Sequence, residues 1–174
     1  MATAVPVLVM NGPVGAGKST IGTEVARQLR QAGVPGAFVD LAVIGQAWPE
    51  PVHDRWQERL VHANLACMWR NFAAAGARRL VLCRVLEDRS LLRRVEAAVP
   101  GAQITVVRLR LPLATIHSRL RAREAPRGAD WYLGAAAYLV DRMEAAGVDD
   151  HVVDNTGHPA EVAATILRIV GWAP

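Results

Sequence analysis

Three glycines, a lysine and a serine lie within one eight-residue stretch near the start of this 174-residue chain. The stretch Gly12–Ser19 reads Gly-Pro-Val-Gly-Ala-Gly-Lys-Ser and fits the pattern GxxxxGK[ST] at every fixed position. Glycines let successive backbone N–H groups turn inward around an anion without a clash from Cβ. In such a loop Lys18 would neutralise β- and γ-phosphates, the Ser19 hydroxyl would hold Mg²⁺ and Thr20 would donate to the α-phosphate. The stretch therefore predicts a site for a nucleoside triphosphate, ATP with Mg²⁺.

The segments on either side of the loop support this prediction. Val5–Met10 predicts a strand, and the spacing of Ile21, Val25 and Leu29 predicts a helix from Lys18 to about residue 32. A helix N-terminus adds unpaired N–H donors and partial positive charge. The predicted nucleotide-binding residues of the loop are Gly12, Pro13, Val14, Gly15, Ala16, Gly17, Lys18, Ser19 and Thr20.

The lysine of the loop carries information of its own. Lys18 is the only lysine among the chain's 20 lysines and arginines. A compact ammonium fits between phosphate oxygens, whereas a planar guanidinium is too wide. The alternative is a glycine-rich turn that happens to carry a lysine. Strand, loop, helix and lone lysine together favour the phosphate site.

The rest of the chain alternates short β-branched runs with helical stretches, which predicts βαβ units around a parallel sheet. Further strands are expected at residues 36–41, 80–86, 103–111 and 151–154. Helices are expected at 52–75, 90–98, 113–124, 131–146 and 159–170. Residues 125–129, rich in Pro and Gly, interrupt the pattern. We therefore expect one α/β domain over residues 1–174: a P-loop NTPase with three α/β/α layers, a five-stranded parallel sheet and a short arginine-bearing lid at about residues 122–132.

Composition narrows the function classes. Cys67 and Cys83 lack metal-ligand spacing, which predicts free thiols in a reducing cytosol. The apolar runs are too short to span a bilayer, and the N-terminus carries no secretory pattern. The net charge of +4 is scattered, without a basic run or an interleaved aromatic stripe. We expect a cytoplasmic monomer or homodimer without a membrane or nucleic-acid partner.

Three segments carry a resemblance to a known group. They are the P-loop, the run Val106–Leu113 followed by His117–Glu124, and Val152–Gly157 before the last helix. Together they resemble the small P-loop kinases of metabolites and antibiotics, a group that contains gluconate, shikimate and adenylylsulfate kinases and chloramphenicol phosphotransferase. The resemblance implies an AAA-type ATP-binding protein of unassigned substrate, with a lid and an adenine-side loop.

Arginines near the interruption are candidates for catalysis. Arg119 and Arg123 are spaced i, i+4 on one predicted helix face, and Arg127 lies within the interruption. Phosphoryl transfer needs positive charge around the γ-phosphate. The resemblance implies that Arg119 stacks on adenine and that Arg123 or Arg127 reaches phosphate. The alternative is a solvated arginine-rich helix face. For the other side of adenine the resemblance implies Asn155, Thr156 and Pro159, although a plain turn and helix start explains these residues equally well.

The acceptor side has one leading candidate and two weaker ones. Asp40 lies near the end of the predicted strand 36–41, where ligands of open parallel sheets bind. Its carboxylate could accept the proton of an acceptor hydroxyl or, with Ser19, support Mg²⁺. Alternatively, Asp40 caps the next turn. Glu87 and Asp88 offer a second choice for magnesium support, and the sequence does not decide among the three.

Residues 41–59 form a candidate acceptor lid with Trp48, Arg55 and Trp56, although aromatic side chains more commonly pack on the sheet. The leading hypothesis is an ATP-dependent phosphotransferase that moves the γ-phosphate to a hydroxyl of a small molecule, a metabolite or an antibiotic. A nucleotide or nucleoside kinase is one alternative. An ATP- or GTP-binding switch with slow hydrolysis is another, weakened for GTP by the absence of NKxD.

Overall fold

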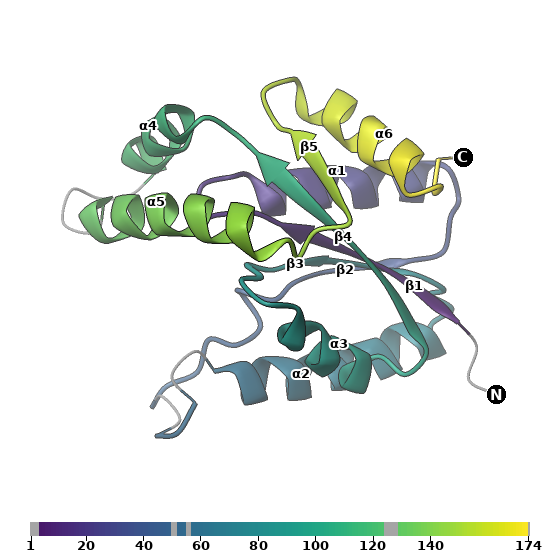
Figure 1. Ribbon diagram of the computed structural model, residues 1–174. Helices are drawn as coiled ribbons and strands as arrows, with labels where there is room; N and C mark the ends of the chain where they lie inside the picture. The colour runs from purple at the N-terminus through teal and green to yellow at the C-terminus, as the bar shows by residue number, and fades with distance from the viewer. Residues whose placement is uncertain (1–3, 50–51, 55–56, 124–128, 174) are drawn as a thin grey trace.

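The computed structural model describes residues 4–49, 52–54, 57–123 and 129–173. Its strands are β1 (Val5–Asn11), β2 (Ala37–Asp40), β3 (Leu80–Cys83), β4 (Ala102–Arg110) and β5 (His151–Asp154). Its helices are α1 (Lys18–Gln31), α2 (Glu58–Ala74), α3 (Leu92–Ala98), α4 (Leu113–Arg123), α5 (Ala129–Ala146) and α6 (Pro159–Ile169), with a 3₁₀ turn, η1 (Arg89–Leu91), before α3 (Figure 1).

The five strands form one parallel sheet in the order β2-β3-β1-β4-β5. β1 lies at its centre and pairs with β3 on one side and β4 on the other. β2 and β3 lie on one side of β1, whereas β4 and β5, which come later in the chain, lie on the other side. The direction in which strands are added therefore reverses at β1. Such a switch point places a crevice beyond the carboxyl ends of the strands. The predicted α/β fold with a five-stranded parallel sheet is confirmed.

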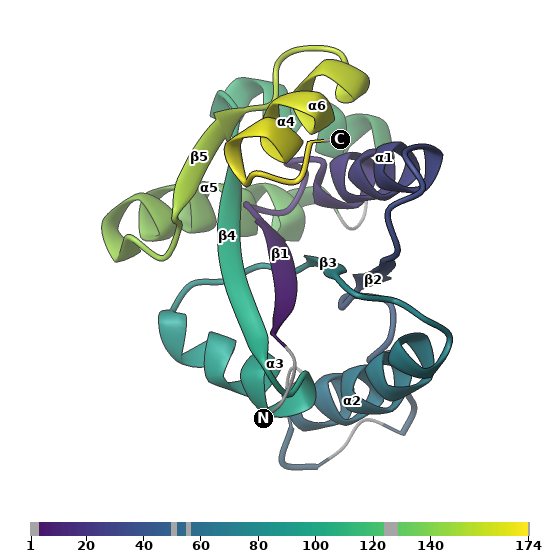
Figure 2. The same cartoon turned by 90° about the vertical axis from the view of Figure 1, so that its right-hand side faces the viewer.

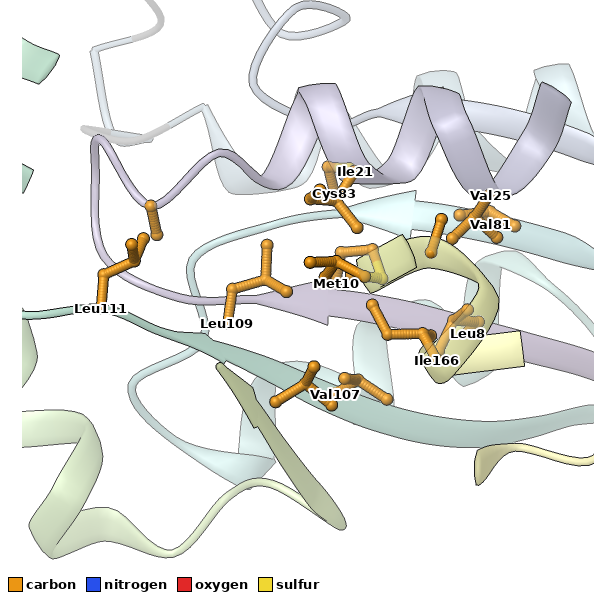
Figure 3. Packing of buried hydrophobic residues seen from close by; sticks show 14 of the residues in the cluster. Leu8, Met10, Ile21, Val25, Val81, Cys83, Val107, Leu109, Leu111 and Ile166 are labelled. Carbon is orange, nitrogen blue, oxygen red and sulfur yellow. The ribbon is translucent and has the colours of Figure 1, made fainter. Parts of the chain in front are cut away.

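Helices cover both faces of the sheet (Figures 1 and 2). On one face Leu8 and Met10 of β1 pack with α1 and α6, as Figure 3 shows for Val25 and Ile166. On the other face the alternate β1 residues pack against α2 and α3. Strands buried on both faces read as continuous apolar runs, which is why β1 shows no polar alternation. Burial of these two apolar layers stabilises the sheet that positions the site.

Two helices extend beyond the carboxyl edge of the sheet. α4 follows β4 and packs against α5, and both project past the strand ends (Figure 1). Ile116 and Leu120 of α4 are fully buried in the α1–α6 layer, so α4 is anchored to the sheet although it projects from it. No helix in the described ranges is long and apolar enough to cross a membrane.

One predicted helix begins later than the sequence pattern indicates. The pattern predicts a helix from residue 52, but α2 begins at Glu58. Asp54 Oδ2 accepts hydrogen bonds from the backbone N–H groups of Arg59 (2.9 Å) and Leu60 (3.2 Å). A carboxylate that accepts hydrogen bonds from the backbone N–H groups of the first turn marks the N-terminal end of a helix. The predicted start was therefore wrong by about two turns.

One predicted strand ends earlier than the pattern indicates. β3 stops at Cys83, not at residue 86. Backbone pairing with β1 ends where the N–H of Arg84 donates to the carbonyl oxygen of Met10 (3.1 Å). The N–H of Leu86 then donates to Asn11 Oδ1 (2.8 Å). The side-chain amide replaces the next rung of the ladder, so the chain turns away from the sheet. The remaining predicted strand and helix ends fall within about two residues of those observed.

Candidate active site at the carboxyl edge of the sheet

The predicted phosphate loop connects β1 to the first turn of α1 (Figure 1). Gly15 (φ 82°) and Gly17 (φ 89°) adopt left-handed conformations that residues with a Cβ disfavour. A Cβ on Gly17 would also lie 2.9 Å from Asn155 Nδ2. Glycine therefore allows the loop to bend closely over the sheet edge and bring the N-terminus of α1 there. Such an N-terminus is a ready anion site.

Lys18 lies at the base of this loop. Its Nζ donates to the carbonyl oxygens of Gly12 (2.8 Å) and Pro13 (2.9 Å). Burial, helped by the Arg123 charge and opposed by the Asp40 carboxylate, lowers the pKa of Lys18 to about 8. A lysine with this pKa is largely protonated at neutral pH. It offers a desolvated positive charge that fits a phosphate group.

The side chains of Ser19 and Asp40 are in contact, although the two residues lie 21 positions apart in the sequence. The Ser19 hydroxyl donates to Asp40 Oδ2, and Asp40 Oδ1 accepts the N–H of Ala42 (3.0 Å). The structure thus brings together the two residues predicted for the metal. It also gives Asp40 the turn contact of the alternative interpretation. A hydroxyl beside a carboxylate fits Mg²⁺, which prefers oxygen ligands.

The predicted adenine-side residues divide into two groups. Asn155 is buried, and its Nδ2 donates to the Ala16 carbonyl (2.7 Å), which ties the loop after β5 to the P-loop. Arg119 Nη2 lies 3.4 Å from the Asn155 carbonyl, and both side chains line the same cleft as Pro159. Thr156 is exposed and is not among the described residues that line the cleft.

A single cleft of about 1150 Å³ contains most of the predicted site. One part, which we call the loop end, is lined by Val14, Gly15, Gly17, Lys18, Ser19, Thr20, Arg119, Arg123, Asn155 and Pro159. The other part, the far end, is lined by Asp40, Ala42, Glu58, Arg84, Val85, Glu87 and Leu91. A wall of α5 residues borders the cleft: Trp131, Tyr132, Ala135, Tyr138 and Leu139. Residues 124–128 of the predicted lid, Arg127 among them, lie outside the described residues.

The neighbouring carboxylates Glu87 and Asp88 have different surroundings. Glu87 lines the far end of the cleft. Asp88 is exposed, and its Oδ1 accepts the N–H of Ser90 (2.6 Å) at the start of η1. The hydrogen bonds from Ser90 lower the pKa of Asp88, and the charge of Arg142 on α5 lowers it further. Asp88 therefore acts as a turn cap in this structure, and its neighbour faces the cleft.

The predicted acceptor lid contributes other residues than its tryptophans. Trp48 is 86% exposed and is not part of the described cleft lining, so it neither packs on the sheet nor faces this cleft. Arg55 and Trp56 lie outside the described residues. Ala42 and Glu58, at the two ends of the segment, do line the cleft.

Sequence reasoning missed Glu58, Arg84 and the α5 wall. Glu58 forms an ion pair with Arg84, and both side chains are less than one-fifth exposed. The signal for Arg84 was its place as the one charge within an apolar run. The signal for the wall was the i, i+4, i+7 spacing of Trp131, Ala135 and Tyr138.

Sequence reasoning also missed Asn11, whose side-chain amide binds the start of the P-loop. The residue is fully buried, and its Oδ1 accepts the N–H groups of Gly12 and Leu86, each at 2.8 Å. Its Nδ2 donates to Asp149 Oδ1 (2.9 Å), and Asp149 Oδ2 lies 2.7 Å from Arg108 Nε. One amide thus joins the P-loop, the segment after β3 and the segment before β5. A polar residue that ends an otherwise apolar strand was the available signal.

Within the described residues, no group of three or more His, Cys, Asp or Glu side chains is arranged to hold a metal ion by itself. The site fits a nucleoside triphosphate with Mg²⁺ by other features. The loop has the conformation of an anion cradle, Lys18 supplies a desolvated ammonium, and Ser19 with Asp40 supplies hard oxygen atoms.

No protein-family model and no curated protein sequence matches this chain. Solved structures do match over nearly the full length. The tunicamycin resistance protein of Deinococcus radiodurans superposes with a TM-score of 0.68 at 20% identity, covering 98% of this chain and 99% of that one. Shikimate kinase of Bacteroides thetaiotaomicron gives 0.63 at 13% identity, with 96% and 98% covered. The APS kinase of Mycobacterium tuberculosis, solved with AMPPNP and APS, gives 0.57 at 20% identity, with 98% and 99% covered.

These identities carry the fold and not the substrate. The parallel sheet, the loop after β1 and the helices beyond the carboxyl edge all belong to that shared architecture. This chain therefore has the fold of the small P-loop kinases, as the resemblance of its sequence segments implies.

Proposed function

We propose that this protein is an ATP-dependent phosphotransferase that moves the γ-phosphate to a hydroxyl group of a small molecule. The observation that carries the proposal is the continuous cleft, which joins the phosphate loop to the carboxylate of Asp40 and to a further space beyond it. A protein that only binds and hydrolyses a nucleotide needs no such second compartment.

The chain's own residues have defined tasks in this reaction. ATP supplies the phosphoryl group, and Mg²⁺ offsets its charge. Lys18 and the loop amides would hold the phosphates, and Ser19 would hold Mg²⁺. Asp40 would either take the proton of the attacking hydroxyl or support Mg²⁺ together with Ser19. A bond forms between the hydroxyl oxygen of the acceptor and the γ-phosphorus. The bond between the γ-phosphorus and the oxygen that bridges it to the β-phosphate breaks, and ADP leaves.

Positive charge near the transferring group comes from α4. Arg123 lines the loop end of the cleft and lies close enough to Lys18 to lower its pKa, whereas Arg119 is assigned to the adenine side. Charge positioned in this way stabilises the oxygens of the transferring phosphoryl group. We extend the same role to Arg127, which follows α4 in the sequence.

A screen for ADP release tests the proposal. Purified protein is incubated with Mg²⁺–ATP and, separately, with sugars, nucleosides, amino alcohols and hydroxylated antibiotics. We expect at least one compound class to accelerate ADP release and to gain a phosphate by mass spectrometry. Lys18→Ala serves as the inactive control. Slow ADP release that no hydroxyl compound accelerates would favour the switch instead, and acceleration by nucleosides alone would favour a nucleoside kinase.

A further inference from the structure

The far end of the cleft carries more negative than positive charge. Its charged lining residues in the described part of the chain are Asp40, Glu58, Glu87 and Arg84. The cations Lys18, Arg119 and Arg123 line the loop end. Three carboxylates against one guanidinium repel an anion at the far end, because like charges placed together disfavour binding. The cations that suit phosphates line the loop end, and Asp40 borders both parts of the cleft because it accepts the hydrogen bond of the Ser19 hydroxyl.

The one guanidinium of the far end already has an anionic partner. Arg84 forms its ion pair with Glu58, and the two side chains are 17% and 19% exposed. Burial lowers the pKa of Arg84, and the nearby Asp40 carboxylate opposes that shift. A carboxylate on a ligand would have to displace Glu58 from Arg84. Displacement leaves a mostly buried carboxylate without its cation, which is strongly unfavourable.

Glu58 also presents an oxygen that lacks a hydrogen-bond donor. Its Oε2 is buried and accepts no hydrogen bond within the described ranges. His62 Nδ1 lies 3.5 Å from this oxygen, and burial lowers the pKa of His62, which favours its neutral form. A buried acceptor without a donor is costly. Displacing Arg84 from the other oxygen would therefore leave the Glu58 carboxylate with still fewer partners.

The α5 wall of the cleft is aromatic and exposed. Trp131 and Tyr138 are 63% and 59% exposed, and their spacing places them two turns apart on one helix face. Ala135 lies between them in the sequence and lines the same cleft. Trp131 is fixed edge-on to Tyr132, with ring centroids 4.9 Å apart. Exposed aromatic surface in a cleft suits the flat or apolar face of a ligand.

We propose that the acceptor is a hydroxyl compound that carries no anionic group and has at least one apolar or aromatic face. Its hydroxyl or amino groups meet the carboxylates of the far end, and its apolar face packs on the α5 wall. This inference rests on the proposed phosphotransferase function. The Glu58–Arg84 pair is the specificity element: it satisfies the guanidinium internally and thereby excludes carboxylated and phosphorylated acceptors.

The test uses three glycosides that differ in one group each. Phenyl β-D-glucoside is neutral and aromatic, phenyl β-D-glucuronide adds a carboxylate, and methyl β-D-glucoside lacks the ring. Binding is measured by isothermal titration calorimetry without ATP, so that it is independent of transfer. We expect the phenyl glucoside to bind at least about tenfold more tightly than the glucuronide. We expect it to bind several-fold more tightly than the methyl glucoside.

Variants of the ion pair change the charge preference in opposite directions. Glu58→Gln frees Arg84, so the preference for the glucoside over the glucuronide should fall toward one or invert. Arg84→Gln leaves three carboxylates without a cation, so the same preference should increase. Glu96→Gln, an identical change on the exposed face of α3, should leave the ratio unchanged. Two variants with opposite expected signs protect the test against a loss of folding in either one.

Variants of the wall test the apolar contact. Tyr138→Ala should remove most of the preference for phenyl over methyl glucoside. Trp48→Ala, which removes a highly exposed aromatic outside the described cleft lining, should not change it. The proposal is overturned if the glucuronide binds wild-type protein as tightly as the glucoside, if neither Glu58→Gln nor Arg84→Gln changes the ratio, or if no neutral glycoside binds at millimolar concentration.

The two proposals fail in different experiments. Selective binding of neutral glycosides without any accelerated ADP release would refute the phosphotransferase and keep the assignment of the far end as a neutral-ligand site. Efficient phosphorylation of carboxylated sugars would support the phosphotransferase and refute the exclusion of anions.

Discussion

The two ends of the cleft are built in different ways. The loop end comes mainly from one continuous stretch, in which the backbone amides, Lys18 and Ser19 follow one another along the chain. The far end takes Asp40 from β2, Glu58 from α2 and Arg84 from the segment after β3, and the α5 wall adds a fourth element. The loop end, formed by one contiguous stretch, suits the phosphate groups of a nucleotide, which many proteins bind. A site assembled from separate elements can change one residue at a time, which is how one fold serves many acceptors.

The largest effect is expected at the loop end. Lys18→Ala should lower phosphoryl transfer by about 10³-fold or more, because it removes a preorganised charge from a desolvated site. ADP formation and ATP calorimetry measure the effect, and circular dichroism checks the fold. Lys18→Arg sharpens the test, since a guanidinium should not restore activity if shape matters as well as charge. Unchanged ATP affinity and turnover in Lys18→Ala would remove the phosphate site from the loop.

The next effect tests whether Asp40 belongs to the acceptor or to the metal. Asp40→Asn should lower transfer by at least about 10²-fold, the usual range for loss of a general base. ATP affinity without acceptor should change little, because Lys18 and the loop amides remain. Strong loss of Mg²⁺–ATP binding would instead assign Asp40 to the metal through its contact with Ser19. If neither quantity changed, Glu87 would become the leading carboxylate of the far end.

A smaller effect is expected from the arginines that border the loop end. Arg123→Ala should lower turnover by about tenfold and ATP affinity by less, because its charge acts on the transition state. Arg127→Ala should behave in the same way. Arg121→Ala is the matched control on α4, because Arg121 is exposed and outside the described cleft lining. Equal turnover in all three variants would return this helix face to the role of a solvated surface.

The smallest effect concerns pH and again separates the two ends. The pKa of Lys18 is about 8, below the unfolded value of 10.5, so about half of Lys18 is deprotonated at pH 8. ADP affinity should fall about twofold between pH 7 and pH 8 and further above that. The unfolded chain holds the Lys18 proton up to higher pH, so this group makes the free protein more stable as pH rises from 8 to 10.5. Binding of neutral glycosides at the far end should not follow the same titration. A flat ADP affinity between pH 7 and pH 9 would contradict the assignment.

The fold was largely accessible from periodicity. Alternating strand and helix patterns predict all five strands, and the parallel sheet is confirmed. The errors occur where a single side chain replaced a backbone partner. Asp54 took the first donors of α2, and Asn11 took the partner of Leu86 after β3. Neither change leaves a periodic trace in the sequence: Asn11 and Leu86 lie 75 residues apart, and the hydrogen bonds of Asp54 to the start of α2 do not alter the spacing of the apolar residues around it.

The sequence determined the candidate site in detail only within the P-loop, and it proposed the distant residues Asp40, Arg119, Arg123, Asn155 and Pro159 of the cleft without their contacts. The motif Gly12–Ser19 determines the phosphate loop by itself, since the loop's shape depends on local φ angles and the following helix turn. The meeting of Ser19 with Asp40, the pairing of Glu58 with Arg84 and the aromatic wall of α5 were decided by tertiary structure. Side chains from four elements converge there because parallel strands direct their carboxyl ends to one edge, and which charges meet at that edge depends on packing between distant segments.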